Sequence, residues 1–478
     1  MAELLVFIAL AALIIHTFVC LTFFLSSIRE NEKRASLFGG LQLLLPLGLL
    51  GFVFYLAESG FFESISGMVL LGAGVILIVL APLLLVIKTH PNQKALEGTD
   101  GFIVGRVQRF DESETVFSRN RSLRPGSQQF EQFYAQHPEY AEYDAARRKL
   151  GGPVGKPGSI DRPYEKPNLA ASVASTSFAL HLSVPEVVNP PAYSAFKGER
   201  ISFGPQTATE RVKGYARHLG AGLVGITELN PRWTYSHRGE IFRDNWEDWG
   251  KEIQVSHKYA IVFTTEMSFE MIASAPHTPT SIESRLQYAK GAFISTQLAA
   301  YIANLGYGAT ANHFRHYEGL MVPMAVDAGL GELGRFGYLI TKKFGPRVRL
   351  AAVTTDLPLI ADKPVDIGVE DFCRECKKCA VCCPSNSIPI GDQVEVNGTL
   401  RWKLDEQSCF EYWGKVGTGC NICMRVCPWS HASSFPHRLI KTLVSRNRAA
   451  RRVFTLMDDI FYGRKPKPKA PPLWASYN

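Results

Sequence analysis

The chain lacks the marks of an exported protein and of a nucleic-acid-binding protein. No twin-arginine motif and no basic start precede its first apolar run, where Glu3 is the one early charge, so we expect no secretory signal. Lys and Arg number 52 against 44 Asp and Glu, which gives a net charge of +8. These cations are scattered and form no recognition motif, which disfavours nucleic acid as a partner. The excess instead suits a domain that lies close to anionic lipid headgroups.

The cysteine content leaves little for disulfide bonds. Ten cysteines are present, and eight of them form two sets near the C-terminus, each followed directly by a proline. The first set reads C-x2-C-x2-C-x3-C from Cys373 to Cys383, and the second is Cys409 followed by C-x2-C-x3-C from Cys420 to Cys427. The first run is that of bacterial two-cluster ferredoxins, in which the fourth cysteine ligates the other cluster.

This spacing predicts two [4Fe–4S] clusters that share eight thiolates. Four-cysteine zinc sites also use CxxC pairs, but two complete quartets with this internal spacing make zinc the weaker interpretation. Cys20 and Cys382 remain, and we expect both to be small buried side chains in a reducing compartment without disulfides. Cluster 1 is predicted to be held by Cys373, Cys376, Cys379 and Cys427, and cluster 2 by Cys383, Cys409, Cys420 and Cys423. The chain is therefore expected to transfer electrons.

Three apolar runs occupy the N-terminal part, at about 4–25, 37–56 and 67–87. Each is near the ~20 residues that an α-helix needs to cross a bilayer, which predicts a multi-pass transmembrane anchor over 1–90. The first loop carries three Lys or Arg residues, whereas the second carries two Glu and no cation. The positive-inside rule then places the first loop, and everything after the third run, on the cytoplasmic side of the inner membrane.

The rest of the chain divides by composition into four stretches. Residues 91–170 predict an N-terminal extension or connector, with a helix over 127–150. Alternating helix and strand signals then favour an α/β or α+β core over 171–365. Within it, helices are predicted at 209–218 and 281–305, and strands at 223–226, 259–264 and 350–355. A ferredoxin-like domain is predicted over 366–435, and 436–478 is expected to pack on the core.

A glycine-rich stretch lies within this core, from Asp327 to Gly337. Gly329, Gly331 and Gly334 would let the backbone approach a large cofactor closely, and Arg335 would add a cation beside it. The stretch is not a Rossmann fingerprint, because its spacing and strand context do not fit. Taken alone, it is better interpreted as a plain turn.

Several segments together are similar to one known family. They read KGYARHLGAGLVGITELNPRWTYSH at 213–237, LGYGA at 305–309, VPMAVDAGLGELGRFGYLIT at 322–341, GPRVRLAAVTTDLPL at 345–359 and DKPVDIGVEDFCRECKKCAVCCPS at 362–385. In this order, from about residue 102 onward, they resemble the reductive dehalogenases. The three apolar runs, in place of a twin-arginine signal and a separate anchor protein, resemble a membrane-integral subgroup of that family.

The resemblance implies an α+β fold in which a nitroreductase-like core holds a base-off cobamide, supplied with electrons by the two clusters. It implies reductive removal of halide from a small organohalide by cobamide Co(I), with two electrons and one proton. Tyr288 is expected to donate the proton, and Arg349 to be the cation that stabilises its phenolate. In the loop after LGYGA, where the family often carries Asn or another polar residue of the catalytic site, His316 is expected to take that place, with Asn312 or His313 as alternatives. The electron donor is expected to be the quinone pool or a soluble low-potential carrier.

Competing interpretations remain open. An epoxyqueuosine reductase-like enzyme shares a corrinoid core and two clusters but needs no membrane anchor. A membrane-bound ferredoxin-type relay would leave more than 200 residues between the anchor and the clusters without a role. Tyr288 would alternatively be a helix tyrosine with its hydroxyl in water. Arg349 would then be an ordinary strand-end arginine, with Arg335 as the pocket cation.

Overall fold

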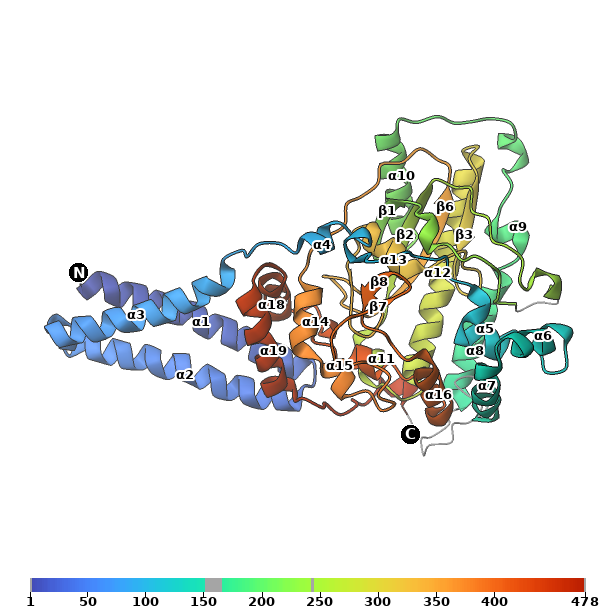
Figure 1. Ribbon diagram of the computed structural model, residues 1–478. Helices are drawn as coiled ribbons and strands as arrows, with labels where there is room; N and C mark the ends of the chain where they lie inside the picture. The colour runs from blue at the N-terminus through green and yellow to red at the C-terminus, as the bar shows by residue number, and fades with distance from the viewer. Residues whose placement is uncertain (1, 151–165, 242–244, 477–478) are drawn as a thin grey trace. The chain divides into compact units, whose positions relative to one another are not determined.

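The computed structural model describes residues 2–150, 166–241 and 245–476 (Figure 1). Its contacts divide the chain into two compact units, each assembled from separate stretches of sequence. The part of the predicted connector at 151–165 lies outside the described residues. The first unit comprises Met1–Pro91, Ile367–Cys376 and His431–Pro466, and the second comprises Asn92–Asp366, Lys377–Ser430 and Lys467–Asn478.

Three long apolar helices form most of the first unit. They are α1 (Ala2–Arg29), α2 (Lys33–Glu58) and α3 (Ile65–Val86), and the short helix η1 (Phe61–Glu63) joins the last two. Each of the three is long and apolar enough to cross a membrane. Many of their large apolar side chains are exposed, which is the pattern of helices that face lipid. The three helices predicted from the apolar runs are therefore confirmed.

Two C-terminal helices pack against the ends of these apolar helices. They are α18 (Phe435–Arg446) and α19 (Arg448–Tyr462). Between them, Asn447 Nδ2 donates hydrogen bonds to Leu84 O at 2.8 Å and Ile87 O at 2.7 Å. Arg34 Nε, on α2, donates to Ile460 O at 2.8 Å. The structure thus groups residues 436–466 with the N-terminal helices, together with α14 (Val369–Cys376), which packs on α19.

A four-stranded antiparallel sheet lies at the centre of the second unit (Figure 1). Its order is β1–β2–β6–β3, with β1 (Leu223–Glu228), β2 (Tyr259–Glu266), β3 (Ala309–Asn312) and β6 (Val348–Thr355). The β-branched and aromatic residues of β1, β2 and β6 favour strands, and the three predicted strands are confirmed. The sequence did not predict β3, because four residues are too few to show an alternating pattern.

Helices cover both faces of this sheet and thereby form an α+β arrangement. On one face, α10 (Pro205–His218) and α12 (Pro279–Asn304) bury side chains such as Leu298 against Val353. On the other face, α13 (Met321–Asp327) buries Met324 against Ala352. Because successive strand residues point to opposite faces, Arg349 shares its face of β6 with Val353 and is directed toward α12.

Two predicted helices differ from the observed ones in their bounds. The predicted helix at 127–150 is divided into α6 (Gln128–Gln136) and α7 (Pro138–Leu150). Pro138 lacks the N–H that would continue α6, so a new helix begins there. Helix α10 begins at Pro205 rather than at 209, because proline is suited to the first helical turn. Helix α12 confirms the long helix predicted at 281–305.

Shorter elements complete the second unit. Its other helices are α4 (Gln93–Leu96), α5 (Val116–Arg121), α8 (Lys166–His181), α9 (Pro185–Val188), α11 (Phe269–Ala273), α15 (Lys378–Val381), α16 (Glu406–Val416) and α17 (Ile422–Arg425). Its other strands are β4 (Glu332–Leu333) with β5 (Leu339–Ile340), and β7 (Val394–Val396) with β8 (Thr399–Arg401), in two small antiparallel sheets. Helices α15, α16 and α17 carry or adjoin those cysteines of the ferredoxin-like segment that belong to this unit.

Candidate active site and cluster pocket

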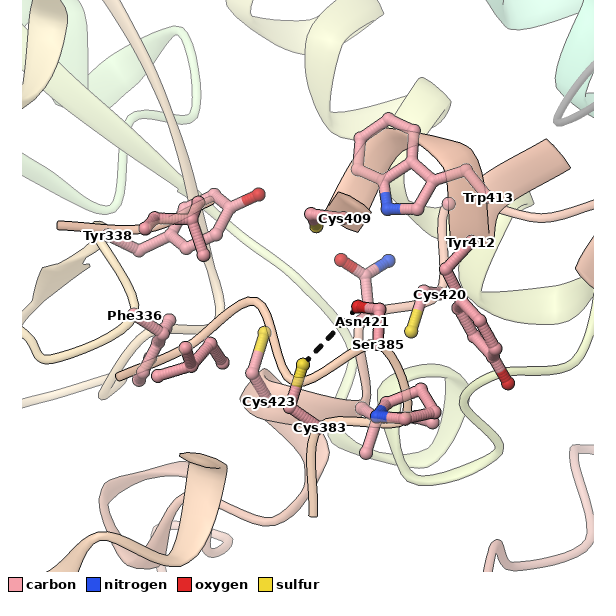
Figure 2. Close-up of a pocket in the computed structure, with 15 residues that line it drawn as sticks. Phe336, Tyr338, Cys383, Ser385, Cys409, Tyr412, Trp413, Cys420, Asn421 and Cys423 are labelled. Carbon is pink, nitrogen blue, oxygen red and sulfur yellow. Dashed lines mark hydrogen bonds between the residues drawn. The ribbon is translucent and has the colours of Figure 1, made fainter. Parts of the chain in front are cut away.

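A cavity in the second unit is lined by the four cysteines predicted for cluster 2. Cys383, Cys409, Cys420 and Cys423 surround it, and aromatic side chains, among them Tyr338, complete the wall (Figure 2). Its empty space is about 480 Å³, part of which is open to solvent. These cysteines come from three separate stretches of sequence, and the folded chain directs them into one cavity.

Short helices and tight turns place these thiols. Asp405 caps α16 by accepting hydrogen bonds from Gln407 N and Ser408 N, which sets Cys409 in the first turn of that helix. Cys420 and Asn421 have φ angles of 58° and 60°, so the chain makes a left-handed turn before α17 begins. This turn directs Cys420 and Cys423 toward the same space as Cys409.

Burial disfavours the thiolate forms of Cys409, Cys420 and Cys423. It raises the pKa of Cys409 and of Cys420 to about 12, and the nearby Cys383 adds repulsion in both cases. Burial and the neighbouring cysteines also raise the pKa of Cys423. Since thiolates are the form that binds metal, a positively charged group is needed to offset four of them in one enclosed space.

The arrangement suits a cluster better than a single ion. Among the described residues, no group of three or more His, Cys, Asp or Glu side chains could hold one metal ion. An iron–sulfur cluster places each thiolate on a different iron, so its ligands stand apart around a cavity. The four thiols around this cavity fit such a cluster.

The cysteines predicted for cluster 1 are distributed over both units. Cys373 and Cys376 lie on α14 of the first unit, whereas Cys379 on α15 and Cys427 after α17 belong to the second. All four are buried. Their binding of a common cluster stays a prediction.

Tyr288 on α12 and Arg349 on β6 lie together. The central carbon of the Arg349 guanidinium is 5.2 Å from the centre of the Tyr288 ring. Arg349 Nη2 donates to Ser284 Oγ at 3.0 Å, one helical turn before Tyr288. Arg349 is 9% exposed, and its Nε has no hydrogen-bond partner among the described residues. A buried cation with an unused donor beside a phenol is suited to stabilise a phenolate or another anion.

The segment 420–424, called the cysteine loop below, contacts the Tyr288–Arg349 pair directly. Asn421, between Cys420 and Cys423, donates from Nδ2 to Ser284 Oγ at 3.2 Å. Met424 Sδ lies 4.0 Å from Arg349 Nη1. Tyr338, in the cavity wall, has its pKa raised by burial and also interacts electrostatically with Arg349 and Cys423. The cluster pocket and the Tyr288–Arg349 pair are therefore neighbours.

The loop after β3 holds the remaining predicted polar residues. Asn312 is buried, and its Oδ1 accepts from Glu318 N at 2.7 Å. His313 is buried as well, with Nε2 3.2 Å from Leu182 O, and burial lowers its pKa to about 4. His316 is half-buried and closes a tight turn by donating from its N–H to His313 O at 2.8 Å. Of the three, His316 is the most accessible.

Packing within the protein surrounds the glycine-rich stretch. A Cβ at Gly329 would lie 2.4 Å from Lys363 O, one at Gly331 would lie 2.2 Å from Ile340 O, and one at Gly334 would lie 2.7 Å from Ile340 Cδ1. These glycines therefore let backbone segments of the core approach one another.

Arg335, within the same stretch, is fully buried. It donates to Pro389 O at 2.8 Å and to Gly391 O at 2.7 Å, and its guanidinium lies 4.5 Å from the centre of a Trp402 ring. It thus ties the core to the ferredoxin-like segment.

Sequence reasoning missed three residues that join the pocket to the Tyr288–Arg349 pair, namely Ser284, Asn421 and Met424. The spacing of Ser284 and Tyr288, four residues apart on one helix, was an available signal. Nothing in the sequence indicated that the cysteine loop reaches α12.

Comparisons with known proteins agree with this arrangement. The family model "4Fe-4S dicluster domain" matches residues 372–435. A tetrachloroethene reductive dehalogenase of Desulfitobacterium hafniense is 36% identical over 285 residues, which cover 50% of this chain and 51% of the relative. Another from Sulfurospirillum multivorans is 33% identical over 292 residues, which cover 55% and 58%. The chain spans about half the length of these curated relatives.

Solved structures give a similar result. A catabolic reductive dehalogenase in complex with 3-bromo-4-hydroxybenzoic acid matches with a TM-score of 0.62 at 27% identity, over 79% of this chain and 49% of that one. A reductive dehalogenase structure described as suggesting a mechanism for B12-dependent dehalogenation matches with a TM-score of 0.60 at the same identity and coverage. An epoxyqueuosine reductase of Cyclobacterium marinum is 35% identical, but over only 120 residues, which cover 24% of this chain and 37% of that one. The match to the dehalogenases is the more extensive one.

Proposed function

The chain is a homologue of the reductive dehalogenases, and we propose that it removes halide from an organohalide. Two electrons and one proton replace the halogen by hydrogen and release the halide ion. The observation that carries the proposal is the contact between the cysteine loop and the Tyr288–Arg349 pair through Ser284. A protein that only relays electrons has no use for a half-buried phenol and a buried guanidinium beside its cluster pocket.

The proposed cofactors are a base-off cobamide in a nitroreductase-like core and two [4Fe–4S] clusters. When bound, the cobamide supplies the low-potential cobalt centre that reduces the carbon–halogen bond. The residues present fit such a group, because the half-buried Tyr317 and Tyr338 both interact electrostatically with Tyr288 and with Arg349, whose Nε has no hydrogen-bond partner among the described residues. Large polar cofactors occupy recesses of this mixed aromatic and polar kind.

The cluster ligands are proposed as the sequence assigns them. Cluster 1 is held by Cys373, Cys376, Cys379 and Cys427, and cluster 2 by Cys383, Cys409, Cys420 and Cys423. Cluster 2 is the one that lies next to the reaction site, since its pocket adjoins Arg349. Gly329, Gly331, Gly334 and Arg335 act indirectly, because they fix the backbone that surrounds the cofactor.

Tyr288 is the proposed proton donor. Its hydroxyl releases a proton to the carbon that loses halide, and the Arg349 guanidinium stabilises the resulting phenolate. Ser284 orients Arg349, and the buried surroundings exclude water from the reacting carbon. His316 is proposed to contact the substrate from the loop after β3.

The membrane is the proposed location, with α1, α2 and α3 as spans and the second unit in the cytoplasm. Cysteine labelling in intact cells tests this orientation, in a chain whose Cys20 is replaced. Ser59→Cys, between α2 and α3, is expected to react with an impermeant reagent, whereas Asn31→Cys, between α1 and α2, is expected to react only after lysis. The reverse pattern contradicts the orientation. The donor is proposed to be the quinone pool or a soluble low-potential carrier.

Cofactor analysis of the full chain, purified without oxygen after expression with cobamide, tests the function. About one cobalt and eight irons per chain are expected, with halide release from tetrachloroethene or 3-bromo-4-hydroxybenzoate under a low-potential reductant. Iron without cobalt would favour an electron relay. A cobalt-loaded chain that reduces epoxyqueuosine in tRNA and releases no halide would favour the epoxyqueuosine reductase alternative.

A further inference from the structure

Three more arginines gather around Tyr288 and Arg349. Arg285 and Arg315 place their guanidinium carbons 5.5 Å and 5.6 Å from the centre of the Phe314 ring. That ring lies 4.8 Å from the ring of Tyr288. Arg121, at the end of α5, interacts electrostatically with Arg285, Arg315 and Tyr288. These three and Arg349 are called the arginine cluster below.

Among the described residues, little negative charge faces the arginine cluster. Glu240 is its carboxylate partner, with Oε2 4.0 Å from Arg315 Nε, and it also acts on Arg121 and Arg285. Within 2–150, 166–241 and 245–476, the side chains of Arg121 and Arg285 form no hydrogen bond and no ion pair, and their guanidinium groups lie over aromatic rings. The Nε atoms of Arg315 and Arg349 are buried without hydrogen-bond partners in the same residues.

Burial and crowding disfavour the charged forms of these arginines. Burial, together with repulsion from Arg315, lowers the pKa of Arg121 to about 9 and that of Arg285 to about 10. Both side chains still carry a proton at neutral pH. Enclosed like charges are unfavourable unless an anion offsets them, and such arrangements are common at binding sites.

We propose that the arginine cluster binds the carboxylate of an aromatic organohalide, and that it selects acidic substrates over neutral ones of the same shape. The inference rests on the proposed function, whose substrate class it names. A guanidinium pairs with a carboxylate through two parallel hydrogen bonds. Phe314 and Tyr288 supply aromatic faces against which the substrate ring packs, next to the proton donor. The phosphate of a bound cobamide is the other source of negative charge.

The test compares two substrates that differ only in charge, 3-bromo-4-methoxybenzoate and 3-bromo-4-methoxybenzamide, with the full, cofactor-loaded chain. The unaltered chain is expected to prefer the acid at least 10-fold in kcat/KM. Arg285→Met and Arg315→Met are each expected to lower this ratio about 10- to 100-fold, since a hydrogen bond to a charged group is lost. Arg285→Lys restores part of the ratio because it restores the charge. Arg211→Met, at an exposed arginine that also lies against an aromatic ring, is the control and leaves the ratio unchanged.

Calorimetry with 4-methoxybenzoate, which has no halogen to lose, gives a second readout. The Kd of 4-methoxybenzoate is expected to rise in both methionine variants by about the same factor as the acid-to-amide ratio of kcat/KM falls. The inference is overturned if the unaltered chain turns over acid and amide equally well and the methionine variants bind 4-methoxybenzoate as tightly as the unaltered chain. Turnover of tetrachloroethene in the same experiment would still support the proposed function. Loss of cobalt from the variants at an unchanged ratio also overturns the inference, because the cluster then binds the cobamide phosphate. A cobalt-loaded chain that binds 4-methoxybenzoate through these arginines but dehalogenates no substrate contradicts the proposed function. The same result supports the carboxylate site.

Discussion

Asn421 and Arg349 donate hydrogen bonds to the same oxygen, Ser284 Oγ, at 3.2 Å and 3.0 Å. One donor belongs to the cysteine loop, and the other belongs to the central strand β6. A hydroxyl has two lone pairs and can accept both. Ser284 therefore holds the cluster pocket and the Tyr288–Arg349 pair in a fixed relationship.

Replacing Ser284 by alanine is expected to lower kcat for dehalogenation about 10- to 100-fold. The variant leaves the buried Arg349 and Asn421 without their common acceptor, and lost hydrogen bonds to charged groups cost roughly 1.5–3 kcal/mol. Steady-state kinetics with cobalt and iron analysis measure the effect. Ser295→Ala is the matched control, because Ser295 Oγ bonds Ala292 O within the same helix. Activity of Ser284→Ala within twofold of the unaltered chain would contradict this role.

Tyr288→Phe is expected to reduce kcat by about 10²- to 10⁴-fold, which is the usual contribution of a positioned proton donor. Cobalt and iron contents should stay at those of the unaltered chain, since the ring and its packing remain. Tyr301→Phe serves as control, because Tyr301 lies on the same helix and packs on Tyr215 with ring centres 5.0 Å apart. Undiminished turnover by Tyr288→Phe would sink the assignment of the proton donor.

Cys423→Ser is expected to remove cluster 2 and with it about half of the iron, because the three remaining thiolates bind a cluster less well. Dehalogenation should fall to background, since cluster 2 adjoins the Tyr288–Arg349 pair. Iron analysis and low-temperature electron paramagnetic resonance measure the loss. Cys382→Ser, at a cysteine outside both predicted quartets, should keep its full iron. Full iron and activity in Cys423→Ser would refute the ligand assignment.

Acid is expected to destabilise the loop that carries His316. Burial lowers the pKa of His313 from 6.5 to about 4, so the unfolded chain takes up the proton more readily than the folded one. The stability contributed by neutral His313 is complete above pH 6.5 and is lost as the pH falls toward 4, on the order of 3 kcal/mol in all.

Thermal unfolding of the full chain in detergent between pH 7.5 and 5 measures this dependence. His313→Gln, whose side chain does not titrate, is expected to show a flatter decrease of Tm with falling pH. His181→Gln, at an exposed position of α8, should retain the slope of the unaltered chain. Equal slopes in all three chains would show that His313 does not govern acid stability.

The local signals in the sequence were strong where one residue type or period dominates. Apolar runs of about the length that crosses a bilayer predicted α1, α2 and α3, and cysteine spacing grouped the four cysteines that line one cavity. The strands with β-branched residues and the long helix α12 were equally visible. Strand β3 was not, because four residues in a sheet are held by their partner β6 rather than by a pattern of their own.

The candidate site divides in the same way. The cysteines were assigned as cluster ligands from their spacing along the chain, and family resemblance pointed to Tyr288 and Arg349. The sequence alone could not show that Asn421 reaches Ser284, or that Arg121, Arg285 and Arg315 gather around Tyr288. Arg285 lies on the same helix as Ser284 and Tyr288, but Asn421, Arg121 and Arg315 lie on other elements. Only side-chain packing against the sheet, with its alternation of faces, decides which of them meet.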